Sequence, residues 1–297
     1  MITTIGEIVR GDAAVFPPYL YEAYRSTLRR APRLPLVEVP LTASELTRPR
    51  LDLSHVTAED ADLTRNAGTG GEALGQRILV TGRVMDEGGT PVPGALLEVW
   101  QANAAGRYIH KRDDWPGPLD PNFLGIGRCL TTDAGEYRFL TVRPGAYPWG
   151  NHENAWRPAH IHFSVLAPSW SQRLVTQMYF PDDPLLELDP IHNAVPDAAR
   201  SRLVAAYAHD VTQPHWALGW RWDIVLAGPD ATAFEAREQS AARARSLPRR
   251  RRRSGRSFTT ACSESIAVSR PPAMRAVCRY TWKAASSTAM APVYRMP

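Results

Sequence analysis

Two histidines separated by a single residue are the side chains in this sequence best placed to bind a metal ion. They lie in the run Pro158-Ala159-His160-Ile161-His162. Because successive side chains of a strand point to opposite faces, His160 and His162 leave such a strand on one side and Ile161 on the other. The pair therefore predicts a metal site. The alternative is structural, with two partly buried imidazoles hydrogen-bonded to the backbone.

Two tyrosines, Tyr108 and Tyr147, are candidates to complete such a site. Imidazole nitrogens and phenolate oxygens together form a hard, anionic donor set, which suits ferric iron better than zinc or copper(I), ions that favour thiolates. A phenol titrates near pH ~10, so binding as phenolate at neutral pH needs a strong Lewis acid. The alternative for each tyrosine is ordinary packing with a hydrogen-bonded hydroxyl.

Short alternating runs separated by Gly and Asp turns surround these residues and predict antiparallel strands. The expected strands span residues 78–85, 94–100, 129–132, 136–142, 159–166, 174–179 and 221–226. This number is enough for two packed sheets, so we expect a mainly β fold, an antiparallel two-sheet β-sandwich of the transthyretin or immunoglobulin type. A few short helices are expected beside it, over residues 18–31 and from Pro196 through Tyr207.

Composition divides the chain into three parts. Residues 1–74 are expected to form an N-terminal arm with short helices, residues 75–230 the β-sandwich, and residues 231–297 a basic tail. Positions 241–297 hold 13 of the 35 Lys and Arg residues but one of the 30 acidic residues, so they carry a net charge of +12 against −7 for the rest. Without an apolar period, this tail is expected to be disordered. We consider nucleic-acid binding by its arginine run the weaker alternative.

Cysteine usage and the N-terminus indicate the compartment. Cys129, Cys262 and Cys278 form no Cys-x-x-Cys spacing, which argues against structural zinc and fits a reducing environment. No run of about 18 apolar residues occurs, and the first residues lack the basic and apolar start of a secretory signal. We therefore expect a cytoplasmic protein that does not bind membranes.

Five motifs occur in an order that resembles the intradiol ring-cleaving dioxygenases. They are Gly106-Arg107-Tyr108, Pro118-Leu119-Asp120-Pro121, Gly127-Arg128-Cys129, Pro144-Gly145-Ala146-Tyr147 and Trp156-Arg157-Pro158-Ala159-His160-Ile161-His162. The resemblance covers about residues 15–235. It implies a non-haem Fe(III) held by Tyr108, Tyr147, His160 and His162 and completed by hydroxide, with Tyr147 acting as a base when a diol binds.

The same resemblance implies roles for five further residues. Arg157 is expected to stabilise negative charge that develops in the substrate ring, the alternative being a surface cation packed on Trp156. Residues expected to line the pocket for substrate or O₂ are Tyr24, Trp149, Gln177 and Ile191. The segment 112–117 has no counterpart in the family pattern and is expected to affect the rim of that pocket.

The implied activity is cleavage of a small aromatic diol by O₂ between its two hydroxylated carbons. The members most like this chain act on protocatechuate in the β-ketoadipate pathway and pair an iron-bearing β subunit with an α subunit of similar fold, so we expect a hetero-oligomer. One alternative is a relative acting on catechol or hydroxyquinol, which usually carries a longer helical N-terminal region. The other is a non-catalytic transthyretin-like binding module, because fold alone does not decide function.

Overall fold

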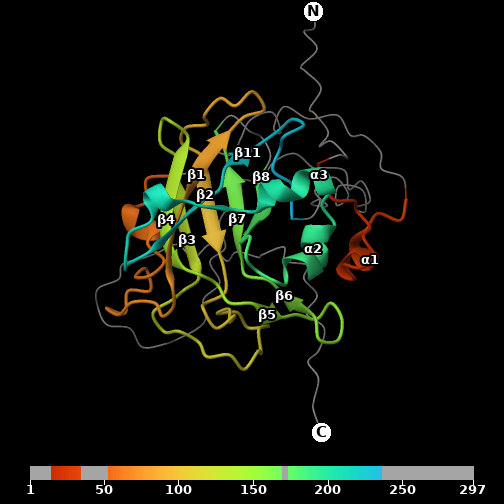
Figure 1. Ribbon diagram of the computed structural model, residues 1–297, viewed down its shortest axis with the longest axis horizontal. Coiled ribbons are helices and arrows are strands. Elements are labelled where there is room, and N and C mark those ends of the chain that lie inside the picture. The colour runs from red at the N-terminus through yellow and green to blue at the C-terminus, as the bar shows by residue number, and fades with distance from the viewer. Residues whose placement is uncertain (1–14, 35–52, 169–172, 236–297) are drawn as a thin grey trace, which may run out of the picture.

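The computed structural model describes residues 15–34, 53–168 and 173–235. In this part of the chain two β-sheets pack against each other, and the short helices α1, α2 and α3 lie to one side of them (Figure 1). The strands are β1 Arg77–Met85, β2 Leu96–Trp100, β3 Ile126–Leu130, β4 Glu136–Val142, β5 Tyr147–Pro148, β6 Trp156–Arg157, β7 His160–Leu166, β8 Arg173–Tyr179, β9 Ala206–Tyr207, β10 Leu218–Arg221 and β11 Ile224–Val225. The predicted mainly β, two-sheet fold is confirmed.

Every helix in the described ranges is short. They are α1 Ser26–Arg30, η1 Ala58–Ala61, η2 Leu186–Leu188, α2 Pro190–Asn193, α3 Asp197–Arg200, η3 Ser201–Leu203 and η4 His209–Val211. Among the residues that the structure describes, no helix has the length and apolar character needed to cross a bilayer.

The first sheet is mixed rather than purely antiparallel. β4 pairs antiparallel with β1, whereas β10 and β11 both pair with β1 in parallel. Gly82 allows this close parallel approach, because a Cβ at that position would lie 1.8 Å from the carbonyl oxygen of Trp222. Of the expected strand over residues 221–226, Arg221 ends β10 and Ile224–Val225 form β11.

The second sheet, in the order β3-β2-β7-β8, is entirely antiparallel, as predicted. β7 is an inner strand, so both of its edges are paired. His162 lies opposite Trp100 of β2 and opposite Gln177 of β8, while His160 lies opposite Tyr179. Side chains that are directly opposite share a face of the sheet. The register therefore gathers these aromatic and polar residues around the two histidines.

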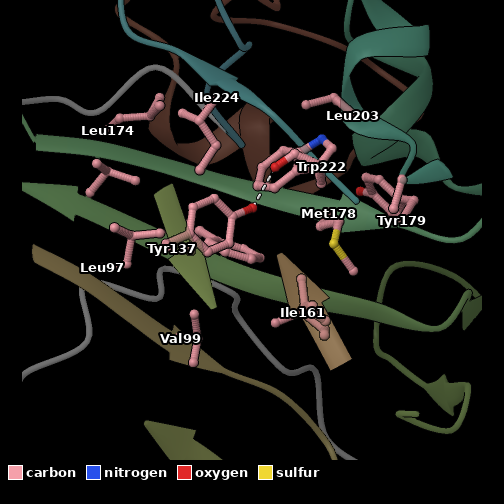
Figure 2. Close-up of a cluster of buried hydrophobic side chains, with 14 of the residues drawn as sticks. Leu97, Val99, Tyr137, Ile161, Leu174, Met178, Tyr179, Leu203, Trp222 and Ile224 are labelled. Carbon is pink, nitrogen blue, oxygen red and sulfur yellow. Dashed lines mark hydrogen bonds between the residues drawn. The ribbon is translucent and has the colours of Figure 1, made fainter. Parts of the chain in front are cut away.

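Aromatic and aliphatic side chains from both sheets form the core. Tyr137 of β4 packs against Phe163 of β7, and its buried hydroxyl donates a 2.5 Å hydrogen bond to the carbonyl oxygen of Trp222. Figure 2 shows this bond together with Ile161, which belongs to the same buried cluster. Ile161 therefore packs in the core while its neighbours His160 and His162 face the opposite side of the strand.

Two predicted helices are wrong in extent. The segment expected to be helical from Pro196 through Tyr207 forms only α3 and η3, because Val204 bridges to Tyr179 and the amide of Ala205 donates to the carbonyl oxygen of Tyr179. Pairing with the end of β8 thus overrides the helical preference. The helix expected over residues 18–31 is limited to α1.

The β-sandwich, called the β body below, ends further along the chain than composition suggests. Composition places residues 231–235 in the basic tail, yet Ala231 and Ala233 are completely buried. The backbone amide of Thr232 also donates to the carbonyl oxygen of Val225. These residues belong to the packed body. Residues 236–297, for which composition predicts disorder, lie outside the described residues.

Candidate metal centre

The four predicted ligands come from three separate segments. His160 and His162 lie on β7, Tyr147 lies on the short strand β5, and Tyr108 lies in the long connection between β2 and β3. The hydroxyl oxygen of Tyr147 is 3.4 Å from Nε2 of His160, and that nitrogen is 3.2 Å from Nε2 of His162. The ring of Tyr108 packs edge-on against Tyr147 with 5.3 Å between centroids. The structure therefore brings together residues that are up to 54 positions apart.

The hydrogen bonds of the two imidazoles decide which nitrogen faces the centre. Nδ1 of His160 lies 2.7 Å from the carbonyl oxygen of Pro158, and Nδ1 of His162 lies 3.1 Å from a carboxylate oxygen of Glu235. Both partners are acceptors, so Nδ1 of each ring carries a proton and donates it there. The two Nε2 atoms consequently face each other across a short gap, and Nε2 of His160 also accepts a hydrogen bond from Arg157.

The distances suit a single ion. Bonds from imidazole nitrogen to a metal such as zinc are about 2.0–2.1 Å long, so one ion reaches two nitrogens 3.2 Å apart. The hydroxyl of Tyr108 is buried and has no hydrogen-bond partner, which leaves its oxygen free for a metal. Within the described ranges, no group of three or more His, Cys, Asp or Glu side chains is arranged to hold a metal. A metal here therefore depends on tyrosine oxygen.

Burial sets the protonation of these ligands. It raises the pKa of Tyr108 well above the usual value, and it also raises the pKa of Tyr147, although the charge of Arg157 opposes it there. Burial and the charge of Arg157 lower the pKa of His160 well below the usual value. At neutral pH His160 is thus neutral, and both phenols keep their protons until a strong cation displaces them. The donor set fits a hard trivalent ion.

A glycine and an aspartate position Tyr108. Gly106 adopts φ +75°, and a Cβ there would lie 2.1 Å from the carbonyl oxygen of Ala146, the residue before Tyr147. The absence of a side chain therefore lets the two tyrosine-bearing segments touch. Asp113 accepts hydrogen bonds from the amide of Tyr108, at 2.7 Å, and from the guanidinium of Arg107. The segment 112–117, which is expected to affect the rim of the pocket, thus also supports a predicted ligand.

Arg157 donates the hydrogen bonds of a buried network beside the two histidines. Its Nη1 donates to Nε2 of His160 at 3.0 Å, and its Nη2 donates to Asp189 at 2.6 Å. The same Nη2 also donates to Gln177 and to the hydroxyl of Tyr179. Burial alone would lower the pKa of Arg157, but Asp189 and the nearby tyrosines raise it well above its usual value. The alternative of a surface cation is wrong, and a permanent positive charge faces the centre.

The four predicted pocket residues take different places around this network. Gln177 accepts the 2.6 Å hydrogen bond from Arg157. The ring of Trp149 lies 5.5 Å from the same guanidinium, and Tyr24 packs on Trp149. Ile191 is buried at the start of α2, where its amide donates to Asp189. Gln177 and Trp149 thus contact Arg157 directly, whereas Tyr24 is connected to it through Trp149 and Ile191 through Asp189.

Several residues of the centre do not stand out in the sequence. The carboxylates are Asp113, Asp189 and Glu235, and the aromatic residues are Trp100 and Tyr179. Asp189 precedes Pro190, and this pairing of a capping residue with proline at a first helical position is a usable signal. Glu235 offers no signal, because local composition places it in the tail.

Comparisons with known proteins agree in pointing to one family. A family model described as "Dioxygenase" matches residues 49–228. A second model, described as "Protocatechuate 3,4-dioxygenase beta subunit N terminal", matches residues 9–42.

Three relatives show how the similarity is distributed. The "Protocatechuate 3,4-dioxygenase beta chain" of Burkholderia cepacia is 55% identical over 219 residues, which cover 74% of this chain and 93% of that protein. The "Protocatechuate 3,4-dioxygenase alpha chain" of the same organism is 33% identical over 165 residues, covering 54% of this chain and 78% of that one. The "Hydroxyquinol 1,2-dioxygenase" of Rhizobium sp. (strain MTP-10005) is 32% identical over 173 residues, covering 52% and 56% respectively.

Proposed function

Because the chain belongs to the dioxygenase family that its residues 49–228 match, we propose that it is the iron-bearing β chain of a protocatechuate 3,4-dioxygenase. The reaction is protocatechuate plus O₂ to 3-carboxy-cis,cis-muconate, so both oxygen atoms enter the product. Identity of 55% across 93% of a β-chain relative supports this assignment. The match of residues 9–42 to a β-subunit N-terminal model supports it independently.

The metal in this proposal is a non-haem Fe(III) bound by Tyr108, Tyr147, His160 and His162. The observation that carries it is the pair of Nε2 atoms 3.2 Å apart, with a hydrogen-bond acceptor at Nδ1 of each ring. Two buried phenols beside them add hard, anionic donors. When bound, ferric iron supplies Lewis acidity and draws electron density from a catecholate, which makes the ring reactive toward O₂.

The protein side chains move one proton and stabilise charge. The phenolate oxygen of Tyr147 accepts a proton from a substrate hydroxyl. Tyr147 itself lies on the two-stranded β5–β6 hairpin rather than in one of the two large sheets. Arg157 presents a fixed guanidinium to the same space, held by Asp189, Gln177 and Tyr179. A preorganised positive charge in a buried site stabilises negative charge developing on the ring without reorganisation.

The proposed assembly includes an α chain. A relative named as an α chain is 33% identical to this chain over 78% of its own length, so the two kinds of subunit are related in sequence. We assign to the α chain part of the pocket wall, including contacts to the substrate carboxylate. Gln177, Trp149, Tyr24 and Ile191 form the part of the wall that this chain contributes.

Activity on catechol or hydroxyquinol is the alternative within the family. It is less well supported, because the hydroxyquinol relative aligns over 56% of its own length, whereas the β-chain relative aligns over 93%. The alternative of a non-catalytic binding module is not supported, because the chain belongs to a dioxygenase family and shares more with it than a β-sandwich fold.

The test combines metal, colour and substrate. The chain is purified alone and co-expressed with an α chain, iron content is measured, and O₂ uptake is followed with protocatechuate, catechol and hydroxyquinol. We expect about one iron per chain, a visible phenolate-to-Fe(III) charge-transfer band, and the fastest turnover on protocatechuate with the α chain present. A colourless protein that stays inactive after iron loading contradicts the proposal, and faster turnover of catechol or hydroxyquinol supports the alternative.

A further inference from the structure

Glu235 lies beside His162, although 73 positions separate the two residues in the sequence. Its carboxylate Oε2 is 3.1 Å from Nδ1 of His162, and its side chain is 21% exposed. On the ring face, the indole of Trp100 stacks on His162 with centroids 4.8 Å apart and an interplanar angle of 4°. Glu235 thus contacts the edge of the His162 ring, and Trp100 contacts its face.

The backbone around Glu235 is anchored to the sheet that carries His162. The amide of Glu235 donates to the carbonyl oxygen of Val175 on β8 at 2.9 Å. The buried hydroxyl of Thr176, the next residue of β8, donates to the carbonyl oxygen of Ala233 at 2.6 Å. Between them, Phe234 packs on Phe16. The carboxylate is therefore fixed in place by neighbouring strands rather than carried on a free end.

The two histidines differ in the acceptor at Nδ1. His160 donates to a backbone carbonyl, which is neutral, whereas His162 donates to a carboxylate. A carboxylate that accepts the Nδ1 proton of a histidine ligand fixes its tautomer and makes its other nitrogen a stronger donor.

We propose that Glu235 is a positioning residue that orients His162 and increases the electron donation of its Nε2 toward the metal. This inference rests on the proposed function, because it assigns a role around the same iron. It makes His162 the stronger of the two imidazole donors. It also means that the last segment of the β body, which composition places in the tail, takes part in holding the metal.

The experiment compares Glu235→Ala and Glu235→Gln with the parent protein and with Glu187→Ala, which removes an exposed carboxylate. Each full-length protein is loaded with Fe(III), and two quantities are measured: iron affinity by competition with a chelator, and the wavelength of the phenolate-to-Fe(III) band. Thermal unfolding of the metal-free proteins serves as a folding control.

The expected result is graded. Glu235→Ala binds iron 10–100-fold more weakly than the parent, the usual cost of losing such a partner. Glu235→Gln keeps an acceptor for Nδ1 and loses less affinity, but its band moves to longer wavelength, because a less basic His162 leaves the iron poorer in electrons. Glu187→Ala matches the parent in both measurements.

Two outcomes overturn the inference. One is a Glu235→Ala protein that keeps iron within threefold of the parent. The other is a Glu235→Gln protein with the affinity and band of the parent, which decides against the inference even where Glu235→Ala fails to fold. Failure of the proposed function looks different, because the parent protein itself then binds no iron and shows no band.

Discussion

Arg157 and Asp189 form a fully buried ion pair, with 2.6 Å between Nη2 and Oδ2 and side chains 2% and 0% exposed. Asp189 uses its other oxygen to accept the amide of Ile191 at the start of α2. One carboxylate therefore links the proposed catalytic guanidinium to the helix that carries a predicted pocket residue.

Removing Asp189 leaves a buried, uncompensated charge. We expect Asp189→Ala to destabilise the protein by about 3–5 kcal/mol and to lower turnover on the order of 100-fold through misplacement of Arg157. Asp189→Asn, which keeps a hydrogen-bond acceptor, should be milder. Denaturant unfolding and steady-state kinetics measure both effects. Asp182→Ala is the control, because Asp182 pairs with Arg143 at the surface, where such pairs contribute about 0–1 kcal/mol. Equal losses in the two alanine variants would contradict this interpretation.

Substitution of the proposed tyrosine ligands should remove colour. Tyr108→Phe and Tyr147→Phe keep the ring packing but delete the oxygen that bonds iron. Each variant is expected to lose most of the iron or most of the visible band, measured by metal analysis and absorption spectroscopy. Tyr207→Phe, at an exposed position, is the control and should leave both unchanged. Full iron content and an unaltered band in either ligand variant would remove that tyrosine from the proposed site.

Gly106 should tolerate no side chain. In Gly106→Ala the new Cβ meets the carbonyl oxygen of Ala146, so Tyr108 and Tyr147 are forced apart. We expect loss of iron in addition to the roughly 1 kcal/mol or more that alanine costs at positive φ. Gly89→Ala is a matched control, because Gly89 has φ +77° but a Cβ added there would meet no atom within 4 Å. Iron binding that is equally intact in both variants would show that the close approach at Gly106 does not position the ligand.

Cys129 should be unreactive while the protein is folded. Burial raises the pKa of its thiol to about 12, so almost none is thiolate at pH 8. In a Cys262→Ser/Cys278→Ser variant, a thiol reagent at pH 8 is expected to label no cysteine in the native protein and one after unfolding in denaturant. Mass spectrometry counts the labels. Rapid labelling of the native variant would argue against the buried position of this thiol.

The proposed division of the chain predicts unequal truncations. Ending the chain after residue 240 removes the segment with a net charge of +12, and we expect iron binding and turnover to persist. Ending it after residue 230 also removes the buried Ala231 and Ala233 and the partner of His162. That shorter chain is expected to lose stability and iron. Thermal unfolding and metal analysis distinguish the two truncated chains. Equal stability and equal iron content in both would contradict the placement of residues 231–235 in the packed body.

The sequence alone determined the features that depend on local pattern. Alternation along β7 predicts that His160 and His162 share a face, and short runs between Gly and Asp turns predict two sheets. Spacing and residue type indicated the histidine pair, and the resemblance to the intradiol dioxygenases implied the two tyrosines of the donor set. Local pattern was unreliable where distant chain segments compete, as at Val204, which pairs with the end of β8 instead of continuing a helix.

Tertiary structure decided which groups complete the centre. Asp189 and Glu235 reach Arg157 and His162 only after the chain has folded, across 32 and 73 positions. No periodicity or composition encodes such a contact, because it depends on the register of β7 against β8 and on the path of the chain after β11. Local pattern and family resemblance therefore predict the ligands, whereas the orientation of each predicted ligand is set by long-range packing.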